Sequence, residues 1–228
     1  MLRALIFDFD GVVVDSEPLI FELTREMAAQ KGWTISEEDY FQNYLALDDR
    51  GIVERLYQSH GLVADRATRD ELVQWKFHQY ARRIRNGLPP LPGAVEFVRR
   101  VAARFPLAIA SGSLRSEVEH LLTKLGLRES FQLLVTSDDT ENSKPDPEIF
   151  LKARAGLNLL ARFQEEPLKA SECLVIEDAP AGVRAAHSAG MKCLALAHSR
   201  PARELAHADW LVGGFAEVDL EAIEKAFA

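Results

Sequence analysis

The stretch Leu5-Ile6-Phe7-Asp8-Phe9-Asp10-Gly11 lies near the start of this 228-residue chain and is its strongest indication of fold and function. From Leu2 to Phe9 only Arg3 and Asp8 are charged, a run typical of a strand that is buried on both faces of a parallel sheet. Two carboxylates at the end of such a strand are costly unless a cation or a reaction compensates them. The stretch therefore predicts a buried strand with a catalytic metal site at its end, around Asp8 and Asp10.

Short apolar runs alternate with helical patterns in the second part of the chain. The strands predicted there are Leu107–Ala110, Leu133–Thr136, Cys173–Ile176, Cys193–Ala197 and a short edge strand, Trp210–Val212. The helices predicted between and after them are 94–104, 116–125, 147–155, 180–189 and 216–227. This order predicts an α/β fold with a doubly wound, Rossmann-like parallel sheet, whose ligands bind at the carboxyl ends of the strands.

The segment between the first strand and this alternating part has a different character. Amphipathic helical patterns cover 17–30, with Ser16 as the expected cap, and then 36–44, 49–59 and 66–85. The segment ends in the Pro- and Gly-rich stretch Asn86–Gly93, which cannot continue a helix. We therefore expect an α/β core domain over 1–15 and 89–228 and an inserted all-helical domain over 16–88.

Composition narrows the function classes. The formal net charge of -8 argues against nucleic acid or an anionic membrane surface as the main partner, because both bind basic faces. No apolar run has the length of a membrane span or the form of a signal peptide, so we expect a cytoplasmic protein, acting as a monomer on a small molecule. The two cysteines fit core positions, and the six histidines lack the spacing of metal ligands.

Polar residues follow the other predicted strands where each one ends. Ser111-Gly112-Ser113 follows the second strand and offers hydroxyls and backbone N–H groups to an oxyanion. Lys144 comes after the third strand, and Glu177-Asp178 ends the fourth. Parallel strands bring their carboxyl ends to one edge of the sheet, so these groups are expected to meet there.

The chemistry open to these groups is narrow. Asp8, the Asp10 carbonyl, Asp178 and Glu177 acting through water suit the oxygen shell of Mg²⁺. A carboxylate beside a metal-held phosphoryl group can attack it, and a second acid can protonate the leaving oxygen, roles that suit Asp8 and Asp10. The Lys144 ammonium and Ser111 then balance the charge of the transferring group.

These motifs, taken together and in order, resemble those of the haloacid dehalogenase superfamily of phosphohydrolases that carry a helical cap. The matching groups are Asp8-Phe9-Asp10-Gly11, Ser111-Gly112-Ser113, Lys144-Pro145-Asp146-Pro147 and Glu177-Asp178. The resemblance implies that Asp8 is the nucleophile, Asp10 the general acid and base, Ser111 the phosphate ligand and Lys144 the orienting cation. It further implies Mg²⁺ held by Asp8, Asp10, Glu177 and Asp178, with Gly11, Gly112 and Ser113 at the substrate.

Within that superfamily the chain is similar to the group of β-phosphoglucomutases and phosphoglycolate phosphatases. Such mutases carry a histidine where this chain has Ile20 and a lysine where it has Leu114 and Arg115, so both departures favour hydrolysis. Related caps place a substrate-facing arginine at the position of Arg50, which implies a further substrate contact.

The sequence thus predicts a magnesium-dependent phosphatase that acts on a small phosphorylated metabolite, such as a sugar phosphate, through an aspartyl-phosphate intermediate. Two alternatives stay open. One is a phosphosugar mutase of the β-phosphoglucomutase type, and the other is a non-catalytic protein that binds a phosphorylated metabolite on the same fold.

Overall fold

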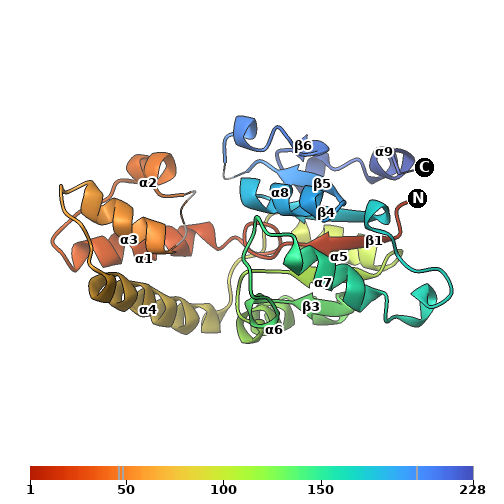
Figure 1. Cartoon of the computed structure of the whole chain (residues 1–228), viewed down its shortest axis with the longest axis horizontal. Helices are drawn as coiled ribbons and strands as arrows, with labels where there is room; N and C mark the ends of the chain where they lie inside the picture. Colours follow the sequence, from red (N-terminus) through yellow and green to blue (C-terminus); the bar gives the residue numbers. More distant parts are fainter. Residues whose placement is uncertain (46, 48, 199, 228) are drawn as a thin grey trace. The chain divides into compact units, whose positions relative to one another are not determined.

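The computed structural model describes residues 1–45, 47, 49–198 and 200–227 (Figure 1). The chain divides into two compact units. The first combines Met1–Asp15 with the chain from Leu88 onward, and the second comprises Ser16–Gly87. Each unit has its own hydrophobic core.

The first unit is built on a six-stranded sheet in the order β3-β2-β1-β4-β5-β6, with every neighbouring pair parallel. The strands are β1 (Ala4–Phe7), β2 (Leu107–Ala110), β3 (Leu133–Val135), β4 (Cys173–Glu177), β5 (Lys192–Leu196) and β6 (Trp210–Val212). The α/β fold with a doubly wound parallel sheet is confirmed. The predicted strands lie where the sequence places them, with ends that differ by one or two residues.

The central strand β1 fixes the position of the site. Leu5 is in register with Leu107 of β2 on one side and with Leu174 of β4 on the other. All four residues of β1 are fully buried, as a continuous apolar run on a central parallel strand requires. The carboxyl ends of β2, β1 and β4 therefore lie next to one another, and the residues after each strand share one edge of the sheet.

Helices pack on this sheet and supply the rest of the core. They are α5 (Ala94–Ala102), α6 (Arg115–Lys124), α7 (Glu148–Leu157), α8 (Pro180–Ser188) and α9 (Leu220–Lys225). Phe150 of α7 and Val183 of α8 lie in one fully buried cluster with β-strand residues such as Ile6 and Val175. This cluster holds α7 and α8 against the strands.

The final helix is shorter than predicted. The periodicity suggests a helix from Ala216, but α9 begins only at Leu220, after a 3₁₀ turn at Phe215–Glu217. The carboxylate of Asp219 accepts a hydrogen bond from the backbone N–H of Ala222 and so caps the helix at that point. The start of this helix is therefore set by the side-chain cap and not by the spacing of its apolar residues.

The second unit is entirely helical among its described residues. Its helices are α1 (Glu17–Ala29), α2 (Glu37–Asn43), α3 (Asp49–Gln58) and α4 (Arg66–Arg83), followed by a 3₁₀ turn at Ile84–Asn86. Met27, Tyr40, Ile52 and Leu56 belong to its separate apolar core. Separate cores are consistent with two units that each stabilise themselves.

The start of α1 differs from the prediction. Ser16 was expected to cap this helix, but its backbone already has helical angles (φ -87°, ψ -16°) and its side chain caps nothing. The caps that form are Ser36 and Asp65, whose side chains accept from Asp39 N and Thr68 N at 3.1 and 2.7 Å. A side-chain cap requires a cap residue with non-helical backbone angles, which Ser36 and Asp65 have and Ser16 lacks.

Across the ranges that the structure describes, none of the helices combines the length and apolar character that crossing a membrane requires.

Candidate active site

Asp8 follows directly on β1 and is held there by its own backbone. Its N–H donates to the carbonyl of Ile176 at 2.9 Å, which continues the pairing of β1 with β4 by one residue. The carboxylate is buried and accepts a hydrogen bond from Lys144 Nζ at 2.8 Å. The predicted nucleophile is therefore fixed at the centre of the strand edge.

Lys144 joins the ends of three strands. Its ammonium donates to Asp8 Oδ1 at 2.8 Å, to Glu177 Oε1 at 2.7 Å and to the carbonyl of Ala110 at 3.1 Å. It also lies 5.1 Å from the ring centroid of the buried Phe150, a cation–π distance. Burial alone would lower the pKa of this amine, but the charges of Asp8 and Glu177 outweigh it and raise the pKa. Lys144 is therefore a permanent cation.

Three carboxylates gather beside this cation. One oxygen each from Asp8, Glu177 and Asp178 lies within 4.8 Å of the others. Burial raises the pKa of Asp8 from 3.8 to about 7; the Lys144 charge opposes that rise, and the Glu177 charge adds to it. Burial and the negative charges of Glu177 and Asp8 raise the pKa of Asp178, and the positive charges of Arg200 and Lys144 oppose that rise. The site therefore holds more negative charge than Lys144 and Arg200 balance.

Two glycines leave room for these carboxylates. A Cβ on Gly11 would lie 2.2 Å from Asp178 Oδ2, and one on Gly182 would lie 1.7 Å from Glu177 Oε1. Gly11 also has a φ of +71°, which residues with a side chain rarely adopt. The carboxylates of Asp178 and Glu177 thus pack directly on backbone, and their positions depend on the absence of a side chain at these two glycines.

Asp10 turns toward a different partner from Asp8. Its Oδ2 accepts a hydrogen bond from Ser113 Oγ at 2.5 Å, so its carboxylate faces the loop after β2. In the same loop, Ser111 is fully buried and its Oγ accepts from Ser113 N at 3.0 Å. Ser113, which was predicted to lie at the substrate, thus binds the carboxylate of Asp10, the predicted general acid. Gly112 is exposed, and a Cβ added to it would meet nothing within 4 Å.

The donor set fits a hard divalent cation. It consists of carboxylate oxygens alone, which are ligands that Mg²⁺ prefers. Burial raises the pKa of Asp8 and of Asp178, so a bound cation would be needed to favour their ionised forms. The Asp10 carboxylate is not part of this group of three. Coordination of the metal by the Asp10 backbone carbonyl stays a prediction.

Some residues of the site were missed from the sequence. His198 Nε2 lies 2.7 Å from the carbonyl oxygen of Gly11, and the charge of Arg200 acts on Asp178. Both follow β5, which ends at Leu196. The strand-end rule was applied to four strands, and extending it to the fifth would have found them. No comparable signal marks Phe150, because a Phe in a predicted helix is normally assigned to the hydrophobic core.

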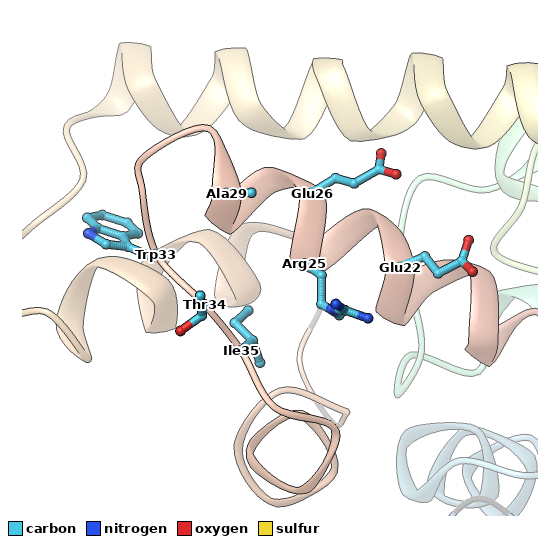
Figure 2. A pocket seen from close by; sticks show the side chains of 7 residues that line it. All are labelled: Glu22, Arg25, Glu26, Ala29, Trp33, Thr34 and Ile35. Carbon is cyan, nitrogen blue, oxygen red and sulfur yellow. The ribbon is translucent and has the colours of Figure 1, made fainter.

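Arg50, which is predicted to contact the substrate, belongs to the second unit. It lies on α3 in the helical unit, where its side chain is exposed. That unit also carries an open groove of about 430 Å³ between α1 and the segment that follows it (Figure 2). The groove is lined by Glu22, Arg25, Glu26, Ala29, Trp33, Thr34 and Ile35, and none of the predicted site residues lies in it.

Comparison with known proteins places this geometry in a family. Residues 5–196 match the haloacid dehalogenase-like hydrolases, a range that includes every residue from Asp8 to Asp178 described above. A phosphorylated carbohydrates phosphatase of Thermotoga maritima is 32% identical over 197 residues, which cover 84% of this chain and 83% of that protein. The fructose-1-phosphate phosphatase YqaB of Escherichia coli is 31% identical over 190 residues, covering 82% of this chain and 92% of its own length.

The fold comparison agrees. The crystal structure of β-phosphoglucomutase from Clostridium difficile superposes with a TM-score of 0.76 at 24% identity and covers 100% of this chain and 97% of its own. At that identity the likeness speaks for the fold alone. On the sequence match and the geometry together, the chain belongs to the haloacid dehalogenase-like hydrolase family and is a phosphoric monoester hydrolase.

Proposed function

We propose that this protein is a magnesium-dependent phosphatase of a small phosphorylated carbohydrate, with Asp8 as nucleophile. The observation that carries the proposal is the contact of Lys144 with both Asp8 and Glu177, because it joins a buried carboxylate, a fixed cation and an acidic group at one point. The relatives named as phosphatases of phosphorylated carbohydrates and of fructose 1-phosphate support the substrate class.

Asp8 and Asp10 divide the reaction between them. An Asp8 oxygen attacks the phosphorus, the bond from phosphorus to the substrate oxygen breaks, and an aspartyl phosphate forms on Asp8. Asp10 gives its proton to the departing oxygen and later takes one from the water that attacks this phosphoryl group. The hydrogen bond from Ser113 Oγ at 2.5 Å holds Asp10 in a separate direction from Asp8, so that the two acids have separate tasks.

Charge on the phosphoryl oxygens needs fixed cations and donors. Lys144 is held by Asp8, Glu177 and the Ala110 carbonyl, so its ammonium requires no reorganisation during the reaction. The Ser111 hydroxyl and the N–H groups of the loop after β2 add hydrogen-bond donors. Mg²⁺ held by Asp8, Asp178 and the Asp10 carbonyl, with Glu177 acting through water, would supply the Lewis-acid charge that lets an anionic nucleophile approach an anionic phosphate.

Hydrolysis is favoured over phosphosugar mutation by a contact of Arg115. At the place where mutases carry a lysine, this chain has Leu114 and Arg115, and the Arg115 guanidinium binds the Asp139 carboxylate at 2.7 Å and the Leu134 carbonyl at 3.1 Å. A guanidinium committed to these two acceptors does not replace the missing lysine. Arg50 is kept as a predicted contact to a second phosphate or carboxylate of the substrate.

A panel of sugar phosphates and other phosphorylated metabolites, assayed for free phosphate with Mg²⁺ and with a chelator, tests the proposal. We expect release of phosphate from a phosphorylated carbohydrate that depends on the metal. The same panel is then followed for isomerised product, with and without a sugar bisphosphate. Isomerisation without net phosphate release would assign the protein to the mutases, and inactivity on every phosphomonoester would refute the proposal.

A further inference from the structure

His198 connects the end of β5 to the loop that follows the predicted nucleophile. Its Nε2 lies 2.7 Å from the carbonyl oxygen of Gly11, a residue 187 positions earlier in the chain. A carbonyl oxygen can only accept, so Nε2 carries the proton and donates it. The neutral Nε2–H form and the charged ring both provide this donor, so the contact does not depend on the protonation state.

The residue that His198 holds is tightly placed on its other side. Gly11 follows Asp10, has a φ of +71°, and lies so close to Asp178 that a Cβ would be 2.2 Å from Oδ2. Its N–H donates to the Val14 carbonyl at 2.9 Å, and Val13 N donates to the Phe9 carbonyl at 2.8 Å, which closes a turn. The turn is therefore fixed internally by backbone and pressed on one side against a carboxylate of the acidic group.

The carbonyl of Gly11 is the atom through which His198 links this turn to the end of β5, while the Val13 carbonyl accepts from Leu91 N at 3.0 Å. Without the His198 donor, the peptide between Gly11 and Val12 keeps only the long hydrogen bond from Val12 N to the Phe9 carbonyl, at 3.3 Å, and the turn is held less firmly against Asp178. Some groups do not bind a metal themselves but hold its carboxylate ligands in place. Removing such a group commonly lowers metal affinity or activity by about 10–100-fold.

We propose that His198 is a positioning residue, which fastens the Asp10–Val14 turn against Asp178 and so preorders the acidic group for its cation. The ring is not a member of that group. The consequence for catalysis rests on the proposed function, whereas the effect on the turn does not.

The test compares three variants of the whole chain with the parent. His198→Phe keeps a flat ring but has no donor, and His198→Gln places an amide N–H near the position of Nε2. His207→Phe is the matched control, because His207 is also exposed in the α/β unit and its ring contact is with His187. Free energies of unfolding measured in urea show whether each variant is folded as stably as the parent.

Amide hydrogen exchange over residues 9–15, followed by mass spectrometry without metal, reads the turn directly. We expect His198→Phe to exchange on the order of 10-fold faster there, and His198→Gln and His207→Phe to stay near the parent. An unchanged rate in His198→Phe overturns the proposal. A glutamine variant that exchanges as fast as the phenylalanine variant overturns it as well, because the donor would then not matter.

Calorimetric titration with Mg²⁺ gives a second readout. We expect binding about 10-fold weaker in His198→Phe and restored in His198→Gln, with kcat reduced more than KM is raised. If the parent protein hydrolyses no phosphomonoester, the proposed function fails while the exchange rates still decide the role of His198.

Discussion

In the helical unit the buried Lys76 is paired with Asp49, whose side chain is 44% exposed, whereas in the α/β unit Lys144 bridges Asp8 and the fully buried Glu177. The first pair is balanced, and its carboxylate can hydrate. Beside Lys144 and its two carboxylates, Asp178 adds a third carboxylate, and burial raises the pKa values of Asp8 and Asp178. Buried charge in the helical unit is matched locally, and buried charge at the sheet edge is left in excess.

The difference separates a structural role from a functional one. An ion pair with one partner next to water contributes little to stability and requires no further cation to balance it. An excess of buried carboxylates costs free energy in the metal-free protein and is retained where a cation or a reaction uses it.

The Asp8→Asn variant should lose turnover on the order of 10,000-fold or more, because an amide oxygen cannot attack phosphorus to form the aspartyl phosphate. Its stability at neutral pH should not fall, since a buried carboxyl with a raised pKa is removed. The measurements are single-turnover kinetics on the best substrate of the panel and urea unfolding. Asp49→Asn in the helical unit is the control, and turnover kept by Asp8→Asn would exclude Asp8 as the nucleophile.

Replacing each lysine by Met tests the comparison through stability. Lys144→Met leaves buried carboxylates unpaired and should cost about 3–5 kcal/mol of unfolding free energy at pH 7. Lys76→Met leaves the half-exposed Asp49, which water can solvate, and should cost about 1 kcal/mol. Urea denaturation with and without Mg²⁺ measures both, and saturating metal should recover part of the loss in Lys144→Met alone. Equal losses in the two variants would show that the two pairs do not differ in the way described.

The metal-free protein should become less stable as the pH rises from about 5 to 7. Folding raises the pKa of Asp8 from 3.8 to about 7, so in this window the folded chain holds a proton that the unfolded chain has lost. Stability is therefore full below the unfolded pKa and falls at up to about 1.4 kcal/mol per pH unit for one proton. The raised pKa of Asp178 acts in the same direction.

Urea midpoints between pH 5 and 7.5 in a chelator measure this slope. Mg²⁺ should flatten it, because a bound cation favours the ionised carboxylates, and Asp8→Asn should flatten it as well. Stability that rises with pH in the chelator would contradict the raised pKa of Asp8.

Much of the α/β unit could be predicted because one signal repeats: an apolar strand, then polar residues at its end. Asp8, Lys144, Glu177 and Asp178 all follow this pattern, and the structure brings them into contact. The pattern gives the location of side chains along the chain but not their direction. It could not show that Asp10 faces Ser113 rather than the acidic group.

Helix ends were predicted less well because caps depend on backbone angles. Ser16 and Asp219 are both residue types that cap helices, yet only Asp219 does so. Gly182 falls inside the predicted helix 180–189 and was not singled out, although its lack of a side chain is what leaves space for Glu177. The close approach of a carboxylate to a backbone atom leaves no pattern in the sequence.

Gly182→Ala is expected to have the smallest effect of these variants. It tests whether activity and stability depend on the position of the Glu177 carboxylate. A Cβ there would lie 1.7 Å from Glu177 Oε1 and 1.9 Å from Cδ, so the carboxylate has to move away from Lys144. We expect a loss of about 1–3 kcal/mol in stability and of about 10-fold in kcat. Gly214→Ala in the same unit is the matched control, since a Cβ there meets nothing within 4 Å. A Gly182→Ala enzyme with the kinetics of the control would show that Glu177 can be displaced without cost, and the excess charge at the sheet edge would then have to reside in Asp8 and Asp178 alone.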